Sequence, residues 1–231
     1  MVETYVITGA NRGIGLEMAR EALAKKIRTI AICRNPEGAD ALKSLKIKYG
    51  PLCEVAFADV CDAPSLDRVA TKIEGVVDAV ICNAGVMSAR GGINDEGNTI
   101  DSIRSVMLTN MVGPFFTARA FLELLSGSVK PRVAVISSFM GSQQHTGSSA
   151  YFYRASKAGA NNLMVTMSNE LRARGIAVAA YHPGWVKTGM GGQGADLTPQ
   201  KSASALIARF QELDMSKSGR FINYDGEYLP L

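Results

Sequence analysis

The sequence predicts an α/β protein with a single-domain Rossmann-type fold: a doubly wound parallel sheet with helices on both faces. Three observations support it. Strand-length apolar runs alternate with helix-like runs along the chain. The strand-length runs are apolar at consecutive positions, as in strands buried on both sides of a parallel sheet. Glycines and polar residues collect just after these runs. No linker or repeat interrupts the alternation, so we expect one domain over residues 1–231.

The elements follow one another in a regular order. The first strand is predicted at 4–8, and runs of the same β-branched or apolar type predict the others at 28–33, 53–58, 77–82, 132–137 and 176–181. Helix-like runs lie between the strands, at 14–26, 38–48, 64–74, 99–125 and 151–174. Pro64 and Pro199 are each placed as in the first turn of a helix, where a missing amide hydrogen is tolerated.

The composition indicates a globular protein of the reducing cytoplasm. Hydrophobic residues make up 47% of the chain and charged residues 20%, which is ordinary for a protein with a buried core. The net charge of +4 comes from scattered lysines and arginines, which argues against nucleic-acid binding. The four cysteines form no CxxC pair and there are only two histidines, so we expect no metal site. Residues 5–7 look like a core strand and not a signal peptide, and the longest uncharged stretch is too polar for a membrane span.

A glycine-rich loop follows the first strand. Ligands of such sheets bind beyond the carboxyl ends of the strands. The loop runs Thr8-Gly9-Ala10-Asn11-Arg12-Gly13-Ile14-Gly15. Its glycines permit a tight turn and the close approach of a pyrophosphate to the start of the next helix. The spacing is not GxGxxG, and a purely structural turn is the alternative interpretation.

The residues after the second strand favour NADP over NAD. A cofactor with a free ribose 2′-hydroxyl is usually met by a carboxylate at this position. The sequence has Cys33 and Arg34 instead, and Arg12 in the glycine loop is a second cation. Two guanidinium groups suit a 2′-phosphate. The alternative is that Arg34 is a solvated loop residue.

Tyr153 and Lys157 are the candidate reacting pair. Four residues apart on a predicted helix, they share one face, whereas Tyr151 lies about 120° away from Lys157. A unit charge about 4 Å away is worth roughly 4 kcal/mol at an effective dielectric of about 20. We therefore expect Lys157 to lower the pKa of Tyr153 and make it a usable acid or base. The alternative is an ordinary solvated helix face.

Further polar residues follow the other predicted strands, at the same edge of the sheet as the glycine loop. Asp59 follows the third strand, Asn83-Ala84-Gly85 the fourth and Ser137-Ser138 the fifth. Asn110 is an awkward residue for the middle of a helix, and Gly113-Pro114 should loosen the helix there. We interpret His182 as a packed or capping residue and His145 as solvated or touching substrate.

Together these motifs resemble the short-chain dehydrogenase/reductase family over nearly the whole chain. The glycine loop, Asp59, Asn83-Ala84-Gly85 and Pro183-Gly184 match the family's cofactor site, with Cys82 where a second Asn is frequent. Asn110, Ser138, Tyr153 and Lys157 match its catalytic tetrad. The segments 33–36, 182–188 and 218–221 are most similar to the sniffer-type carbonyl reductases and the C-factor signalling proteins.

The resemblance implies an NADPH-dependent carbonyl reductase. Tyr153 would donate the proton, Ser138 would hold the carbonyl oxygen, Lys157 would lower the pKa of Tyr153 and bind the nicotinamide ribose, and Asn110 would anchor a water that links Lys157 to solvent. The implied cofactor contacts are Gly9, Asn11, Arg12, Gly13, Ile14, Gly15, Arg34, Asp59, Val60, Asn83, Ala84, Gly85, Tyr153, Lys157, Pro183, Gly184, Val186 and Thr188.

The expected substrates are small aldehydes, ketones or quinones. Residues 188–200 form a short glycine-rich segment that should cover the substrate, and Trp185, Met190, Phe139 and Met140 offer an adaptable apolar pocket. The alternative function is an NADP-binding signalling or regulatory protein with incidental turnover. An epimerase or dehydratase on the same fold is a third alternative. By analogy with the family we expect a homodimer, formed through helices 99–125 and 151–174.

Overall fold

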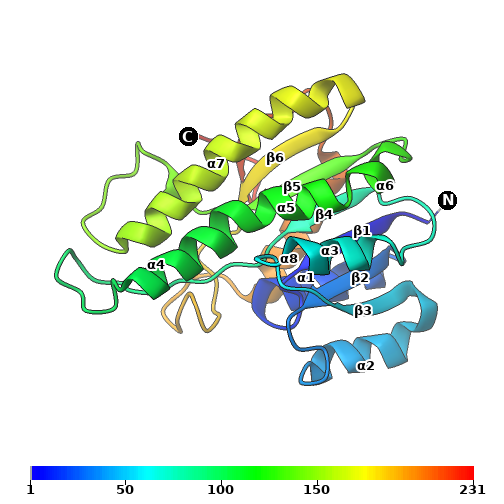
Figure 1. Cartoon of the computed structure of the whole chain (residues 1–231), viewed down its shortest axis with the longest axis horizontal. Coiled ribbons are helices and arrows are strands. Elements are labelled where there is room, and N and C mark those ends of the chain that lie inside the picture. Colours follow the sequence, from blue (N-terminus) through cyan, green and yellow to red (C-terminus); the bar gives the residue numbers. More distant parts are fainter. Residues whose placement is uncertain (1) are drawn as a thin grey trace.

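The strands form one sheet. The computed structural model describes residues 2–231, and its eight strands have the order β3-β2-β1-β4-β5-β6-β7-β8. Every neighbouring pair is parallel except β7 and β8. The order reverses between β1 and β4, which makes this the switch point of a doubly wound sheet. In Figure 1 the strands follow one another from β3 at the bottom to β6 near the top. The predicted fold class is confirmed.

The bounds of the elements are as follows. The strands are β1 (Thr4–Thr8), β2 (Arg28–Cys33), β3 (Cys53–Phe57), β4 (Ala79–Cys82), β5 (Arg132–Ile136), β6 (Ala177–His182), β7 (Phe221–Asn223) and β8 (Tyr228–Leu229). The α-helices are α1 (Gly13–Ala24), α2 (Asp40–Tyr49), α3 (Ala63–Ala70), α4 (Ile100–Met107), α5 (Gly113–Ala120), α6 (Leu122–Ser126), α7 (Tyr151–Leu171) and α8 (Pro199–Glu212). Short helical turns are η1 (Gly50–Leu52), η2 (Leu108–Val112), η3 (Phe139–Gly141) and η4 (Arg172–Arg174).

Each face of the sheet is covered by its own set of helices. On β1, Tyr5 and Ile7 point into a core shared with α1, α2 and α8, whereas Val6 points into a core shared with α3, α5, α6 and α7. All five residues of β1 are buried. This two-sided burial explains why the central strands are apolar at consecutive positions. Figure 1 shows α7 running above α4 and α5 along one face.

The predicted long helix at 99–125 is interrupted. Thr99 caps α4 by accepting the Ser102 amide at 3.2 Å, and a π-helical turn, η2, separates α4 from α5. Asn110 lies inside this turn. The expected loosening of the helix near Gly113-Pro114 is therefore observed, and π-turns of this kind often occur at functional sites.

The C-terminal part contains elements that were not predicted. Strands β7 and β8 have only three and two residues, too short for a periodic pattern. Helix α8 begins at Pro199, as that residue indicated, and packs on α1.

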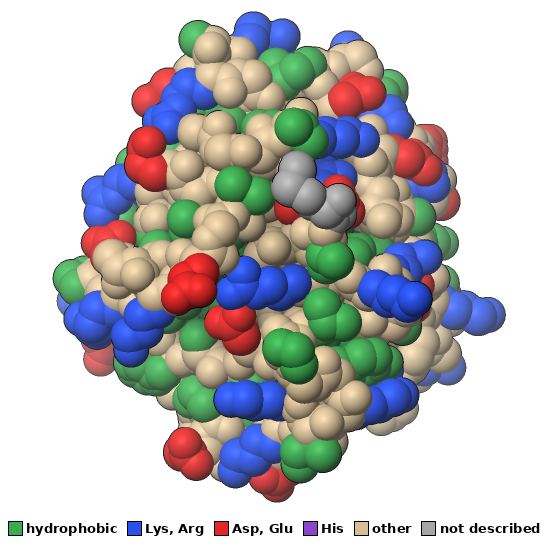
Figure 2. All heavy atoms as spheres, turned by 90° about the vertical axis from the view of Figure 1, so that its right-hand side faces the viewer, with side chains coloured by type: hydrophobic (Ala, Val, Ile, Leu, Met, Phe, Trp, Pro, Cys, Tyr) green, Lys and Arg blue, Asp and Glu red, His purple; other side chains and the backbone are tan. Residues whose placement is uncertain are grey.

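Positive and negative side chains are mixed on the outer surface. Figure 2 shows the face at the right of Figure 1, where Lys and Arg side chains are interspersed with Asp and Glu and do not gather into one basic patch. None of the helices in residues 2–231 combines the length and the apolar character that crossing a membrane requires.

Candidate active site

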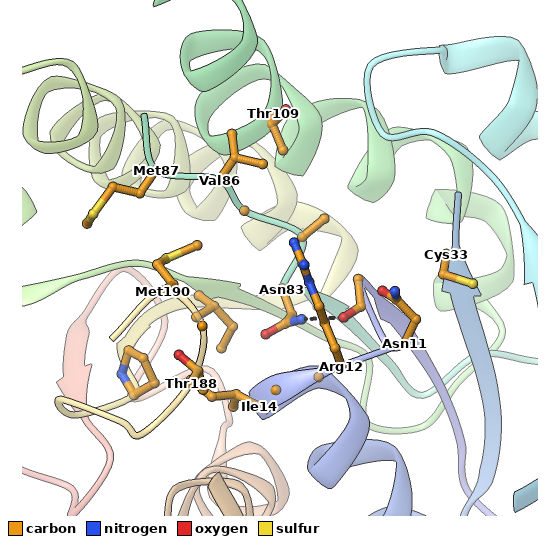
Figure 3. A pocket seen from close by; sticks show the side chains of 18 of the residues that line it. Asn11, Arg12, Ile14, Cys33, Asn83, Val86, Met87, Thr109, Thr188 and Met190 are labelled. Atoms are coloured by element: carbon orange, nitrogen blue, oxygen red, sulfur yellow. Dashed lines mark hydrogen bonds between the residues drawn. The ribbon is translucent and has the colours of Figure 1, made fainter. Parts of the chain in front are cut away.

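A cavity of about 670 Å³ lies at the carboxyl ends of the strands, around the switch point between β1 and β4. Figure 3 shows Asn11 and Cys33 toward one end, Met87 and Met190 toward the other, and the Arg12 side chain extending through the middle. The residues that line the cavity come from the carboxyl ends of β1 to β6 and the loops that follow them, together with α1, η2, α7 and the start of α8. The cavity is therefore long, with the glycine loop along one wall.

The glycine loop is held tightly against the turn after β4. Gly9 has φ +65°, and a Cβ there would stand 2.8 Å from the Cα of Ala84. A Cβ on Gly15 would stand 2.3 Å from Gly9 O. Asn83 Nδ2 donates to Thr8 O at 2.9 Å and to Gly9 O at 3.2 Å. The loop thus needs glycine at both positions, and it brings the start of α1 to the cavity wall without a side-chain cap.

Two arginines line the cavity, as expected for a site that takes a 2′-phosphate. Arg12 and Arg34 are both lining residues. The side chain of Arg34 is 67% exposed, and its Nη1 lies 4.0 Å from Asp59 Oδ2. Asp59 Oδ1 in turn accepts the Cys61 amide at 2.9 Å. An ion pair this long and exposed leaves Arg34 free to turn toward another anion.

Tyr153 and Ser138 lie next to each other, and Tyr153 lines the cavity. Tyr153 is 8% exposed and Ser138 7% exposed. Ser138 Oγ accepts the Met140 amide at 3.2 Å, and a hydrogen bond between Ser138 and Tyr153 favours the ionised phenol. The neighbouring Ser137 instead directs its hydroxyl to Lys157 O at 3.4 Å. The structure thus places Ser138, and not Ser137, beside the phenol.

Lys157 is buried on the same face of α7 but is not bonded to the phenol. Its Nζ donates to Ile136 O at 2.7 Å and lies 5.8 Å from the centroid of the Tyr153 ring. Burial lowers the pKa of Lys157 to about 8. The side chain is therefore a cation close to its titration point near neutral pH.

The expected lowering of the Tyr153 pKa is wrong for this arrangement. Burial raises the pKa of Tyr153, and this effect exceeds the opposing effects of the Ser138 hydrogen bond and the Arg90 guanidinium. Lys157 does not reverse it, because its ammonium group is directed to the carbonyl of Ile136 and desolvation of the phenol dominates. Tyr153 consequently stays protonated at neutral pH.

Asn110 joins the turn after β4 to α7. Its Oδ1 accepts the Val86 amide at 2.8 Å, and its Nδ2 donates to Val86 O at 2.8 Å and to Ser156 Oγ at 3.1 Å. The side chain is 1% exposed. The side-chain amide of Asn110 thus pairs with both backbone groups of Val86 and fixes the wall of the cavity near Lys157.

The turn after β6 forms part of the cavity wall. Gly184 has φ +83°, and a Cβ there would stand 2.3 Å from a methyl carbon of Leu197. Lys187 N donates to Leu197 O at 2.8 Å, so the two ends of the 186–197 segment are joined. Pro183 and Thr188 line the cavity. Gly184 and Val186 belong to the same turn but are not part of the lining.

Most of the expected site residues line the cavity: Gly9, Asn11, Arg12, Gly13, Ile14, Gly15, Arg34, Asp59, Val60, Asn83, Ala84, Gly85, Tyr153, Lys157, Pro183 and Thr188. Asn110, Ser138, Gly184 and Val186 are expected site residues that are not part of this lining. Of the expected substrate residues, Met190 lines the cavity, whereas Trp185, Phe139 and Met140 are not part of its lining. Trp185 is 54% exposed and donates from Nε1 to Gly191 O at 2.8 Å.

The motifs did not identify some of the lining residues. Met87 and Arg90 follow the Asn83-Ala84-Gly85 turn, and Arg90 Nη2 donates to Met190 O at 2.5 Å. This bond joins the loop after β4 to the loop after β6 across the cavity mouth. The only available signal was their position after a strand. Within residues 2–231 no group of three or more His, Cys, Asp or Glu side chains is arranged to hold a metal ion.

Comparison with known proteins relates this site to a family. Residues 3–197 match the family described as short chain dehydrogenase. The chain is 37% identical to C-signal of Myxococcus xanthus over 157 residues, which cover 68% of this chain and 93% of that protein. Among solved structures, the carbonyl reductase Sniffer of D. melanogaster superposes with a TM-score of 0.94 at 27% identity, covering 100% of both chains. The NADPH-bound carbonyl reductase from chicken fatty liver superposes with a TM-score of 0.90 at 31% identity, covering 100% of this chain and 99% of that one.

Proposed function

Because the chain belongs to the short-chain dehydrogenase family, we propose that it reduces the carbonyl groups of aldehydes, ketones and quinones with NADPH, and that Tyr153 is the proton donor. The fold-level likeness to carbonyl reductases supports the reaction class. The residues of the cavity support the finer assignment in two ways.

The cavity fits a dinucleotide with a 2′-phosphate. Gly9 and Gly15 leave no room for a Cβ, so backbone forms the wall next to the first turn of α1, which suits a pyrophosphate. Arg12 and Arg34 are available to hold the extra phosphate of NADPH. When bound, NADPH supplies the hydride.

The buried phenol fits the role of an acid. A raised pKa keeps Tyr153 protonated at neutral pH, and the contact between its hydroxyl and that of Ser138 supports a role for both as donors to one carbonyl oxygen. Ser138 Oγ accepts from the Met140 amide and directs its own proton toward the Tyr153 oxygen, and a bound carbonyl oxygen would take over that donor. Lys157, with its pKa lowered to about 8, is suited to return a proton to the phenol after each turnover. We assign to Asn110 the proton path from Lys157 to solvent, through water held beside the π-turn.

The single observation that carries the proposal is the contact of the Ser138 hydroxyl with the phenol of Tyr153, which lines a cavity that Arg12 and Arg34 also line. The test is a panel of aldehydes, ketones, quinones and the corresponding alcohols, followed at the absorbance of the reduced nicotinamide with NADPH and with NADH. We expect reduction of several carbonyls with a preference for NADPH. No turnover of any carbonyl with either cofactor would reject the proposal.

A second candidate function is an NADP-binding signalling or regulatory protein in which turnover is incidental. The 37% identity to C-signal favours it. The discriminating experiment replaces the native gene with one encoding Tyr153→Phe and compares the cells with a gene deletion. A normal phenotype in Tyr153→Phe cells, beside a defect in the deletion, would favour the signalling role.

We also propose that the protein forms a homodimer through α4, α5 and α7. Leu108 and Phe115, which are each 39% exposed, and Ile100, which is 71% exposed, put apolar side chains on the surface of this helical layer. The molar mass in solution, measured by light scattering, tests this. A monomer at micromolar concentration would reject it.

A further inference from the structure

The hydrogen-bond ladder between β5 and β6 ends in an unusual way. The two strands pair as far as Ile136 and Tyr181, and Ser137 N donates to Tyr181 O at 2.8 Å. One step further the amide of Phe139 would need another backbone acceptor. The carbonyl of Pro183 is already used by Ser202 Oγ, at 2.6 Å. The amide of Phe139 donates instead to Nδ1 of the His182 side chain, at 3.2 Å.

This bond acts on the backbone of a residue assigned to the reaction. The amide of Phe139 belongs to the same planar peptide unit as the carbonyl of Ser138, so holding it fixes the chain direction directly after Ser138. The other side of that unit is held as well, because Gly141 N donates to Ser138 O at 2.8 Å. The position of the Ser138 hydroxyl beside Tyr153 therefore depends on both bonds.

We propose that His182 is a positioning residue for the reduction: its Nδ1 extends the β5–β6 ladder by one bond and thereby holds the Ser138 hydroxyl in place beside Tyr153. This inference rests on the proposed function, because it gives His182 a part in that same site. It also assigns the tautomer of the imidazole. Nδ1 accepts a hydrogen bond, so the proton of the neutral ring is on Nε2.

The surroundings of His182 keep the ring neutral. The pKa of His182 is lowered to about 4, mainly by burial; Asp225 opposes this shift and the imidazole of His145 adds to it. His145 faces it from the loop after η3, Asp225 from the turn after β7, and the Phe139 ring lies 5.8 Å away. An imidazolium has no acceptor on Nδ1, so protonation would place two N–H groups against each other and release the turn.

The direction of the pH effect follows from the lowered pKa. The unfolded chain takes up this proton near pH 6.5, before the folded protein does, so the folded state loses stability as the pH falls from about 6.5 toward 4. Within the folded protein the loss of the His182–Phe139 bond occurs only near pH 4. We expect an acid limb of kcat with an apparent pKa of about 4.

Two nearly isosteric variants provide the test. In His182→Asn the side-chain oxygen takes the place of Nδ1 and still accepts the Phe139 amide, whereas His182→Leu has a similar branched shape and no acceptor. With a carbonyl that the wild type reduces, we expect kcat to stay within threefold in His182→Asn and to fall at least tenfold in His182→Leu, and the NADPH dissociation constant to stay within twofold in both. The acid limb should be absent in His182→Asn. Equal kcat values in the two folded variants, whether normal or lost, would overturn the proposal.

A measurement on the wild type is independent of turnover and of the folding of any variant. The nitrogen chemical shifts of the His182 ring, measured by NMR on protein with labelled histidine at pH 7, should show the proton on Nε2. A proton on Nδ1 would overturn the proposal. A wild type that reduces no carbonyl rejects the proposed function, whereas an active wild type with equal Asn and Leu variants rejects only the role of His182.

Discussion

Lys157 Nζ lies 5.8 Å from the centroid of the Tyr153 ring, and its hydrogen bond goes to Ile136 O and not to the phenol. The two side chains share a helix face, yet the buried ammonium is held by the end of β5. As a result, burial is the largest influence on the pKa of each group: it raises the pKa of Tyr153 and lowers the pKa of Lys157. The site thus holds a protonated phenol beside a cation that readily gives up a proton.

The buried ammonium should cost the fold stability. Lowering the pKa of Lys157 from 10.5 to about 8 corresponds to a cost on the order of 3 kcal/mol at pH 7, at 1.36 kcal/mol for each pH unit. We predict that Lys157→Met raises the free energy of unfolding at pH 7 by ~1–3 kcal/mol and abolishes carbonyl reduction. The gain should shrink as the pH rises from about 8 to 10.5, because the wild-type lysine is then neutral in the folded state. Urea unfolding at pH 7 and pH 10 measures this, and a variant less stable than wild type at pH 7 would contradict it.

Arg34 should determine the choice between NADPH and NADH. Its guanidinium lines the cavity and has only a 4.0 Å ion pair with Asp59 to give up. We predict that Arg34→Gln raises KM for NADPH about tenfold and leaves KM for NADH within twofold. Arg174→Gln is the matched control, because Arg174 pairs with Glu123 at 2.8 Å and does not line the cavity. An unchanged NADPH preference in Arg34→Gln would rule out this role.

Arg90 should act on both the substrate loop and the phenol. Its bond to Met190 O joins the two loops at the cavity mouth, and its charge opposes the rise in the Tyr153 pKa. We predict that Arg90→Gln raises KM for carbonyls several-fold and moves the alkaline limit of the reaction to higher pH, since the phenol then stays protonated longer. Arg90→Lys keeps the charge and should leave the pH limit in place. A pH profile of kcat that is identical in Arg90→Gln and wild type would contradict the electrostatic part.

Much of the fold can be predicted from the sequence because its strands are buried on both faces. Strands β1 and β2 match their predicted bounds, and β3 to β6 differ by only one or two residues at an end. The weak point is the C-terminal part, where β7 and β8 are too short for a pattern and take their place from pairing with β6 and with each other. The π-turn at Asn110 was indicated only by an amide in an unfavourable helix position.

The geometry of the site is harder to predict from the sequence than the fold, because it depends on distances between residues that only the folded chain brings together. The assignment of Ser138 follows from the family pattern, since a serine pair at a strand end does not show which hydroxyl meets the phenol of Tyr153. The direction of the Tyr153 pKa was wrong because sequence spacing gave the helix face but not the Ile136 carbonyl that holds Lys157. Arg90 and Met87 could not be found by motif, because only the folded loops bring them to the cavity.

The central claim is that the phenol of Tyr153 gives the proton during carbonyl reduction. The most direct test is single-turnover reduction of a carbonyl by Tyr153→Phe with saturating NADPH, with Tyr151→Phe as the control, because Tyr151 is 45% exposed and does not line the cavity. We predict a loss of about 10²–10⁴-fold in Tyr153→Phe with the NADPH dissociation constant within twofold, and a normal rate in Tyr151→Phe. A rate in Tyr153→Phe close to that of wild type would contradict the account.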